Sequence, residues 1–127
     1  MKAILDTNAL MVPEQFGVEI FAELQRLGYV EWLVPASVLA ELRTLAVKAN
    51  RGADKVAARV GLGLAERCRT AGDAGADADS AVENLALAEG AAVFTNDRAL
   101  KKRLFSKGIT VIYLRQRRYL EATKKEF

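Results

Sequence analysis

The chain alternates short apolar runs with longer segments in which apolar residues recur every three or four positions. Nearly continuous apolar runs are typical of strands that are buried on both faces of a sheet. Such runs cover residues 2–5, 29–35, 91–96 and 109–114. Helical spacing is found in residues 14–28, 36–50, 53–72, 80–90 and 97–108. Strands are therefore predicted to alternate with helices along most of the chain.

Local signals mark the starts of two predicted helices. Ser80 and Glu83 fit a capping box, in which two residues satisfy each other's free backbone N–H groups. Asp97 stands in the N-cap position of the last predicted helix. Residues 72–80 are expected to form a loop, and the basic end at 115–127 is not assigned to any element.

Alternating strands and helices indicate an α/β fold. Because the strands are nearly continuous in apolar residues, they are expected to be parallel and to be covered by helices on both faces. We predict a three-layer α-β-α sandwich with a central parallel sheet. Ligands bind such folds at the carboxyl ends of the strands, so polar residues at those ends are the first candidates for a functional site.

Length and composition favour one domain. The chain has 127 residues, 51% of them hydrophobic, which is enough for one domain with its own core. Residues 1–127 are expected to form a single domain with a basic C-terminal segment from about residue 98. No apolar run reaches the roughly 18 residues of a membrane span, and Asp6 and Glu14 interrupt any signal-peptide core. A cytoplasmic protein without a membrane partner is expected.

The absence of histidine excludes several kinds of catalytic site. The chain contains no His and one cysteine, Cys68. Ser-His-Asp and Cys-His catalysis, ordinary catalytic zinc and an internal disulfide are therefore excluded. Any catalysis has to use carboxylates, hydroxyls, Lys, Arg or a metal ion held by oxygen atoms.

Acidic residues follow the predicted strands. Asp6 ends the first strand and Asp97 ends the third, so both are expected at the same edge of a parallel sheet. Glu41 lies about one turn into the helix that leaves from this edge. Asp77 and Asp79 precede helix 80–90, and their distance from the edge depends on the three-dimensional fold. Capping explains such residues singly, but no obvious helix follows Asp6 for several residues.

Several carboxylates at one place repel one another unless cations lie between them. Mg²⁺ and Mn²⁺ prefer oxygen ligands and commonly keep several waters. Such an ion binds phosphate oxygens and lowers the pKa of a bound water. The acids therefore predict a metal-dependent reaction on a phosphate ester, which needs no histidine.

The C-terminal segment is strongly basic. Residues 98–127 hold ten Lys or Arg against two Glu, whereas the preceding part of the chain is acidic. This asymmetry favours a polyanion partner such as RNA, although a solvated helix face and a charged tail also explain it. The candidate RNA-binding residues are Lys101, Lys102, Arg103, Arg115, Arg117 and Arg118. Tyr113 and Tyr119 lie among them and either stack on bases or belong to the core edge or a dimer contact.

Four segments resemble the acidic motifs of the PIN-domain ribonucleases, in the same order and at ordinary spacing. They are LDTNAL with Asp6, SVLAEL with Glu41, ADADSAVENLALAEG with Asp79, and VFTNDRALKKRL with Asp97. The resemblance covers most of the chain. It implies a parallel sheet flanked by helices, and an enzyme that cleaves single-stranded RNA with Mg²⁺ or Mn²⁺. It implies that these four acids are the catalytic and metal-binding residues. It also implies supporting roles for Asn8, Asp77, Thr95 and Asn96.

The biological role depends on the subfamily. The segment TNDRALKKRLFSKGITVIYLRQRRYLE resembles the PIN nucleases of archaea and eukaryotes that act in small-subunit rRNA maturation, which implies an rRNA precursor as substrate. The chain lacks the four cysteines that the zinc ribbon of better-known members needs. VapC-type toxins share the four acids and remain an alternative, with an antitoxin protein as partner. The resemblance also implies a homodimer.

Two other classes of function remain as alternatives. A non-catalytic module would use the basic C-terminal face to bind RNA or a protein. A phosphatase with an aspartyl nucleophile also begins with a strand followed by an aspartate, but it needs a second acid two residues later, where this chain has Asn8.

Overall fold

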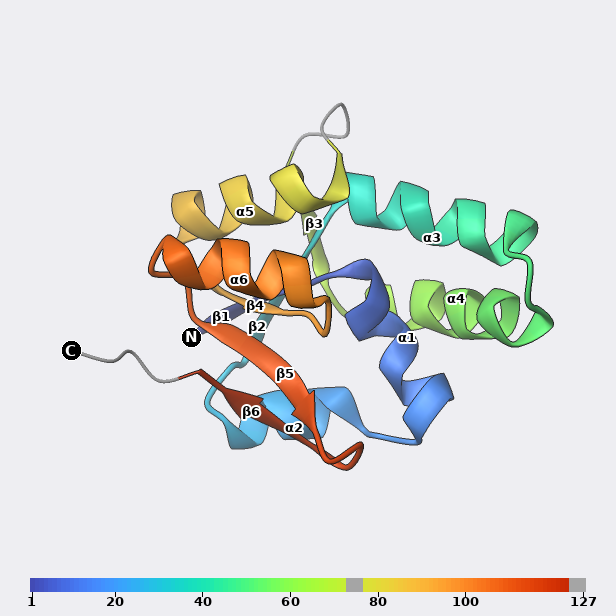
Figure 1. The fold of residues 1–127 in the computed structure, drawn as a ribbon, viewed down its shortest axis with the longest axis horizontal. Coiled ribbons are helices and arrows are strands. Elements are labelled where there is room, and N and C mark those ends of the chain that lie inside the picture. Colours follow the sequence, from blue (N-terminus) through green and yellow to red (C-terminus); the bar gives the residue numbers. More distant parts are fainter. Residues whose placement is uncertain (73–76, 124–127) are drawn as a thin grey trace.

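A mostly parallel sheet organises residues 1–72 and 77–123, which are the residues that the structure, a computed structural model, describes (Figure 1). Its strands are β1 (Lys2–Leu5), β2 (Glu31–Pro35), β3 (Arg69–Ala71), β4 (Ala92–Phe94), β5 (Val111–Arg115) and β6 (Tyr119–Ala122). Their order is β3-β2-β1-β4-β5-β6. All neighbouring strands are parallel except β5 and β6, which are antiparallel. The predicted α/β class is confirmed, with an antiparallel edge that the apolar pattern did not predict.

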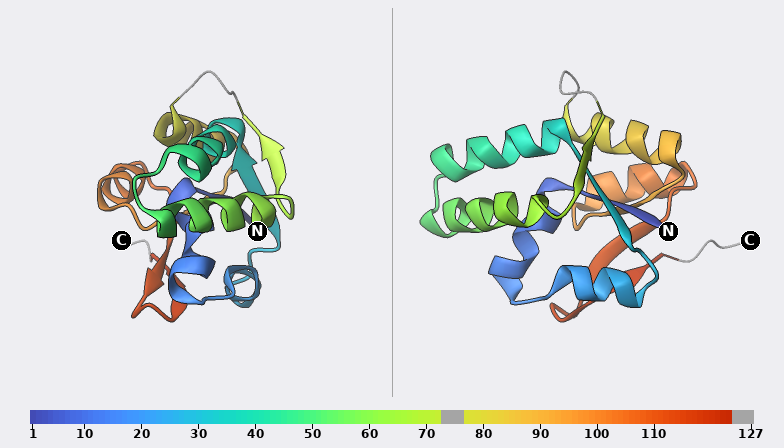
Figure 2. Two further views of the ribbon diagram at one scale, coloured as in Figure 1. Left: turned by 90° about the vertical axis from the view of Figure 1, so that its right-hand side faces the viewer. Right: turned by 180° about the vertical axis from the view of Figure 1, so that it is seen from behind.

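Helices cover both faces of this sheet. In the described residues they are α1 (Thr7–Phe16), α2 (Ile20–Arg26), α3 (Ala36–Lys48), α4 (Gly52–Ala65), α5 (Ala78–Glu89) and α6 (Arg98–Ser106). α5 and α6 lie on one face, and α1 and α2 lie on the other (Figures 1 and 2). α3 and α4 run antiparallel to each other, and α4 packs on α1. The three-layer arrangement follows from these positions.

The carboxyl ends of β1 and β4 lie side by side at the centre of the sheet. After β1 the chain continues to β2, which lies on one side of the β1–β4 pair, and after β4 it continues to β5, which lies on the other side. Right-handed crossovers that run in opposite directions leave their helices on opposite faces, and open α/β sheets bind ligands at the point where the directions diverge. Leu5 pairs with Phe94 here, so the next residues, Asp6 and Thr95, meet at this point.

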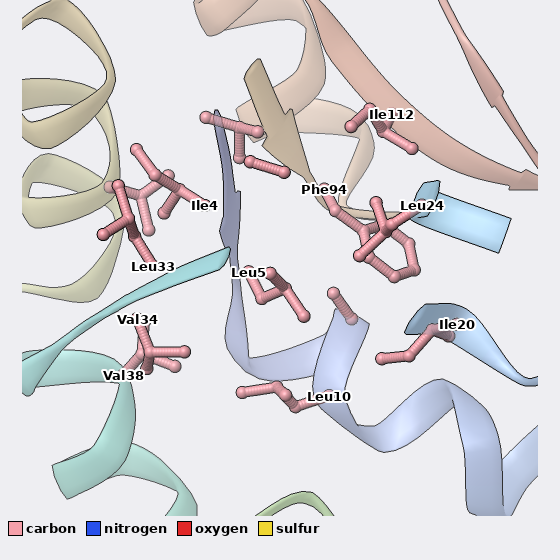
Figure 3. Packing of buried hydrophobic residues seen from close by; sticks show 14 of the residues in the cluster. Ile4, Leu5, Leu10, Ile20, Leu24, Leu33, Val34, Val38, Phe94 and Ile112 are labelled. Atoms are coloured by element: carbon pink, nitrogen blue, oxygen red, sulfur yellow. The ribbon is translucent and has the colours of Figure 1, made fainter. Parts of the chain in front are cut away.

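The strand that carries Asp6 is anchored by two hydrophobic layers (Figure 3). Ile4 and Leu5 are both fully buried, and as neighbours in β1 they point to opposite sides of the strand. Ile4 lies with Leu33, whereas Leu5 lies on the side of Leu10. Burying each large aliphatic side chain contributes about 1.5–3 kcal/mol, so the strand gives Asp6 a rigid support.

The helix predicted over 14–28 is in fact two helices, α1 and α2, and α1 begins seven residues earlier than predicted. Gly17 separates them with φ 67°, and its N–H donates to the Pro13 carbonyl at 2.9 Å, which is a common way to end a helix. The start of α1 was missed because most of its first side chains are buried and give no amphipathic stripe. Pro13 inside the helix also argues against a helix in the sequence.

Residues 69–71 form β3, although the apolar spacing predicts one helix over 53–72. α4 ends at Ala65, and the Cys68 N–H then donates to the Ala65 carbonyl at 2.9 Å in a tight final turn. β3 pairs with β2 at the edge of the sheet. A three-residue edge strand with exposed polar residues carries no apolar run, so the sequence pattern has nothing to mark it.

The predicted capping box at Ser80 and Glu83 is wrong. Asp77 caps α5 instead, and its Oδ1 accepts the Ser80 N–H at 2.8 Å. The Glu83 side chain does not reach back to the start of the helix but is buried in an ion-pair cluster with α6. By contrast, the predicted N-cap at Asp97 is confirmed.

Two predictions fall partly on residues that the structure does not describe. Residues 73–76 of the predicted loop 72–80 and residues 124–127 of the basic end lie outside the described ranges. Within the described ranges, no helix is long and apolar enough to cross a membrane.

Candidate active site

Asp6 joins β1 to α1 and is buried although it carries a charge. Its side chain is 4% exposed. Its backbone N–H donates to the Phe94 carbonyl at 3.1 Å, which extends the pairing of β1 with β4. Its Oδ1 accepts the Thr7 N–H at 2.8 Å, so Asp6 is the N-cap of α1. The expectation that no helix follows Asp6 is therefore wrong, but capping does not require a carboxylate to be buried.

Thr95 connects Asp6 with the start of α6. The Thr95 hydroxyl donates to Asp6 Oδ2 at 2.9 Å and accepts the Asp97 N–H at 3.1 Å. Thr95 itself is fully buried. The two hydrogen bonds fix the second carboxylate oxygen of Asp6 and tie the backbone of Asp97 to it through one hydroxyl group.

Asn8 and Asn96 form hydrogen bonds that hold the segment after β4, residues 95–97, in place. Asn8 Oδ1 accepts the Asn96 N–H at 3.0 Å, and the Asn96 side chain accepts the Leu114 N–H at 2.8 Å. These bonds link α1, the residues after β4, and β5. Asn8, Thr95 and Asn96 therefore hold the loop that carries Asp97 against the end of β1.

Three further predicted acids lie at the starts of helices around Asp6. Asp97 caps α6, and its Oδ1 accepts the Leu100 N–H at 2.8 Å. Asp79 is in the first turn of α5, and Glu41 is in the second turn of α3. All three are exposed. The set consists of one buried carboxylate and three carboxylates that are open to solvent.

Electrostatic repulsion links the four acids. Burial raises the pKa of Asp6 from 3.8 to about 6, local hydrogen bonds oppose this rise, and the charges of Asp79 and Glu41 add to it. Burial also raises the pKa of Asp79, and the charge of Asp97 raises it further. Each acid of the set therefore interacts with at least one other. The structure therefore places Asp6 within the electrostatic influence of Asp79 and Glu41, and Asp79 within that of Asp97.

The donor atoms of this set are all oxygens, and Asp6 forms no ion pair with a cation in residues 1–72 or 77–123. Its two carboxylate oxygens accept hydrogen bonds from neutral groups, the Thr7 N–H and the Thr95 hydroxyl. The Thr7 hydroxyl is buried and has no hydrogen-bond partner among the described residues. In the same ranges, no three candidate ligands are already grouped as a metal site. Oxygen donors without a closed cage fit Mg²⁺ or Mn²⁺, which usually binds one or two carboxylates and keeps several waters.

Comparison with known proteins identifies the family. A family described as "PIN like domain" matches residues 3–117 of the chain. The chain belongs to the PIN-like domain family. "Ribonuclease VapC9" from Archaeoglobus fulgidus is 33% identical to it over 114 residues, which cover 90% of this chain and 83% of that protein. This PIN-like domain is also similar to a solved structure of "the PIN domain endonuclease Utp24", with a TM-score of 0.79. That match covers 98% of this chain and 92% of the other at 23% identity, which shows a shared fold.

Asp77, the predicted accessory acid, differs from its neighbour Asp79. The Ser80 N–H bond lowers the pKa of Asp77, and the nearby Arg103 lowers it further. The pKa of Asp79 is raised. In this PIN-like domain Asp77 is therefore stabilised by its role as a cap. Arg103 also lowers the pKa of Asp79, but it does not offset the rise caused by burial and by the charge of Asp97.

Arg103, a predicted RNA-binding residue, belongs to an ion-pair cluster. Its Nε donates to Glu83 Oε1 at 2.9 Å, and Lys107 Nζ donates to Glu83 Oε2 at 3.0 Å. Glu83 is only 5% exposed, and its pKa is lowered chiefly by the hydrogen bond from Arg103. The cluster joins α5 to α6. Much of the positive charge of Arg103 is therefore balanced inside the protein.

The predicted cations of the C-terminal segment differ in their surroundings. Arg115 forms an ion pair with Glu121 across the β5–β6 hairpin. Arg117 and Arg118 are exposed in the turn of that hairpin, where the Arg118 N–H donates to the Arg115 carbonyl at 3.1 Å. Gln116 and Arg117 have φ values of 53° and 58°, a tight turn of the kind that usually needs Asn or Gly.

Lys101 and Lys102 lie on α6. Lys101 Nζ is 3.7 Å from the centre of the Tyr113 ring, and the Tyr113 hydroxyl donates to Glu121 at 2.9 Å. One ring face of Tyr113 is therefore covered by a cation, which limits the predicted stacking of bases on it. Lys102 is exposed.

The sequence pattern gave Glu83 the wrong role: it predicted a capping-box residue, whereas Glu83 forms the ion pairs that join α5 to α6. Its partners, Arg103 and Lys107, lie 20 and 24 residues away in the sequence, so no local sequence pattern predicts the ion pairs. Its spacing from Ser80 fitted a known local motif instead. The only available signal was an acid beside the buried Val82 and Leu85, which is too weak to identify a partner.

Proposed function

We propose that this PIN-like domain is an endoribonuclease that cleaves single-stranded RNA with the help of Mg²⁺ or Mn²⁺. The observation that carries the proposal is Asp6, a buried carboxylate with a raised pKa, neighbouring acids and neutral hydrogen-bond donors. The VapC9 relative is named a ribonuclease, which supports RNA as the substrate. Utp24, which shares the fold, is named an endonuclease, which agrees with internal cleavage.

Asp6, Asp79, Asp97 and Glu41 would hold the metal ion, one or two of them directly and the others through its bound waters. The ion would supply a bound water of lowered pKa and would stabilise the negative charge of the leaving oxygen. Thr95 and the Thr7 N–H keep the Asp6 carboxylate in one orientation, because each donates to a different oxygen atom. Asn8 and Asn96 keep the loop of Asp97 in register with β1. The exposed acids leave room for the phosphate and for water.

The basic residues would bind the RNA backbone on either side of this site. Lys102, Arg117 and Arg118 are exposed and suited to phosphate contacts. Arg103 and Arg115 are paired with glutamates, so we assign them smaller contributions. Replacing Arg117 and Arg118 together by Ala should weaken RNA binding and reduce its salt dependence.

The first test is cleavage of labelled single-stranded RNA by the pure protein with Mn²⁺, Mg²⁺ or EDTA. The Asp6→Asn variant should retain the N-cap bond and the fold, since Asn is also a good cap, but should lose metal-dependent cleavage. Cleavage at the wild-type rate by this variant would overturn the proposal. Binding of RNA without turnover under any metal condition would favour the non-catalytic binding module instead.

Two biological roles follow from the same chemistry. The basic C-terminal segment, which resembles that of PIN nucleases in small-subunit rRNA maturation, favours maturation of rRNA or another RNA. The relationship to VapC9 favours a toxin whose activity is held in check by an antitoxin protein. Expression in a host cell separates them: arrest of growth that depends on Asp6 and is relieved by a partner protein supports the toxin role. Correct cleavage of an rRNA precursor supports the processing role.

A homodimer remains part of the proposal. The described surface includes exposed Val47 and Val56 on α3 and α4, which a second copy could cover. Light scattering after size exclusion gives the mass in solution directly. A monomer at micromolar concentration would exclude a stable homodimer.

A further inference from the structure

α6 carries cations on two of its sides, and the two sides differ in their surroundings. On the side toward α5, Arg103 and Lys107 are paired with the buried Glu83. On the other side, Arg98, Lys101 and Lys102 form no ion pair within residues 1–72 and 77–123. The sequence shows one basic helix, but the structure separates neutralised cations from cations that are available to a ligand.

The available cations line a surface hollow. Its described lining consists of Arg98, Lys101, Lys102, Phe105 and Thr123. Three cations, one aromatic ring and one hydroxyl contribute to it, and no described lining residue is acidic. Phe105 is 48% exposed, so part of its aromatic ring is open to a ligand. This composition matches the chemistry of an RNA strand, which offers phosphates and aromatic bases.

The hollow begins at Arg98, which directly follows Asp97 of the proposed active site. Asp97 caps α6 and Arg98 is the first residue of that helix. Positions 98, 101 or 102, and 105 recur at helical spacing, so they follow one side of α6 away from Asp97. With a rise of about 1.5 Å per residue, Phe105 lies roughly 10 Å along the axis from Arg98. A strand that leaves the acidic site along α6 would reach Phe105 after a short distance.

We infer that this hollow, which we call the α6 groove, binds single-stranded RNA beside the cleavage site. A base stacks on Phe105, and neighbouring phosphates contact Arg98 and Lys102. Lys101 contributes charge while it is held over the Tyr113 ring. The inference rests on the proposed nuclease function, because it places the substrate of that reaction. Positive grooves with exposed aromatic rings are a common way to bind single strands without reading their sequence.

The test is RNA binding measured in EDTA, where no cleavage is expected. The probe is a short fluorescein-labelled oligouridylate, and fluorescence anisotropy is followed at several salt concentrations. Phe105→Ala should weaken binding roughly tenfold and leave the salt dependence unchanged. Lys102→Ala should also weaken binding and should reduce the slope of log K against log salt by about one.

Matched controls separate the α6 groove from general effects of charge and surface. Val30→Ala changes one exposed apolar residue just before β2, and Lys48→Ala changes one exposed cation at the end of α3. Both variants should bind RNA as the wild type does. Phe105→Tyr keeps an aromatic ring and should retain affinity, whereas Phe105→Leu should not. Thermal unfolding of each variant shows whether the fold is intact.

The outcomes distinguish the α6 groove from the nuclease function. Wild-type affinity in both Phe105→Ala and Lys102→Ala would overturn the inference and leave the nuclease function standing. An equal loss in the Val30→Ala and Lys48→Ala controls would also overturn it. Loss confined to the two groove variants, in a protein that never cleaves RNA, would support the α6 groove while the nuclease function fails.

Discussion

Two carboxylates in this protein are almost equally buried but have opposite electrostatic surroundings. Asp6 is 4% exposed and Glu83 is 5% exposed. Glu83 accepts bonds from Arg103 and Lys107, and its pKa is lowered. Asp6 accepts bonds from neutral groups and faces other acids, and its pKa is raised to about 6.

The opposite pKa shifts of Asp6 and Glu83 indicate different roles for the two carboxylates. A buried charge that is paired with cations adds little to stability but would be costly to unpair. A buried charge without a cation destabilises the folded protein, and such residues concentrate at functional sites. Glu83 fits a structural role between α5 and α6, whereas Asp6 fits a site that is completed by an external cation. Substitutions at these residues and their neighbours test this contrast, from the largest expected effect to the smallest.

The largest expected effect is on cleavage, at two acids near the start of α5. The pKa of Asp79 is raised and that of Asp77 is lowered. Asp79→Asn should reduce the cleavage rate by at least roughly a hundredfold, because it removes a proposed metal ligand. Asp77→Asn should keep the rate within a fewfold of wild type, since Asn also caps the helix. Equal losses in single-turnover assays would show that the contrast between the two acids is wrong.

Removing the charge of Glu83 should lower stability. Glu83→Gln leaves Arg103 and Lys107 without their shared carboxylate. We expect a loss of about 1–2 kcal/mol in the free energy of unfolding at pH 7. This is well below the usual cost of breaking a buried pair, because solvent screens both partly exposed cations. A lowered pKa means that this contribution is present at neutral pH and is lost only as pH falls below about 4.5. Urea unfolding at pH 7 measures the change.

The matched change at Asp6 should raise stability. The raised pKa of Asp6 means that its ionised form destabilises the fold, by up to about 3 kcal/mol. This cost is absent below about pH 4, grows as pH rises, and is complete above about pH 6. Asp6→Asn also weakens the Thr95 bond, so a net gain of about 1–2 kcal/mol is expected at pH 7 in EDTA. Urea unfolding gives the value, and a loss of stability would remove the argument that Asp6 is held for function.

Much of the fold, and the positions of Asp6 and Asp97 at one edge of the sheet, were predictable from the sequence for a physical reason. Parallel strands such as β1 and β4 are apolar throughout, and the sheet rule then brings Asp6 and Asp97 to one edge. The short polar strand β3 and the early start of α1 left no such periodic signal. Glu83 and Phe105 could not be interpreted in advance, because their roles depend on which neighbours the fold brings to them.

The smallest expected effect is on thermal stability in the presence of a metal ion. A ligand that binds only the folded protein stabilises it by RT ln(1 + [L]/Kd), which is about 1.4 kcal/mol at ten times Kd. Mn²⁺ should therefore raise the Tm of the wild type by a few degrees, and should do so less as pH falls through about 6, where Asp6 takes up a proton. Glu83→Gln should show the same increment from a lower starting Tm, because its cluster does not hold the metal. Asp6→Asn should have a higher Tm without metal, and Mn²⁺ should raise that Tm little or not at all. If all three proteins gained the same increment, Mn²⁺ would be binding elsewhere, and the raised pKa of Asp6 would need another explanation.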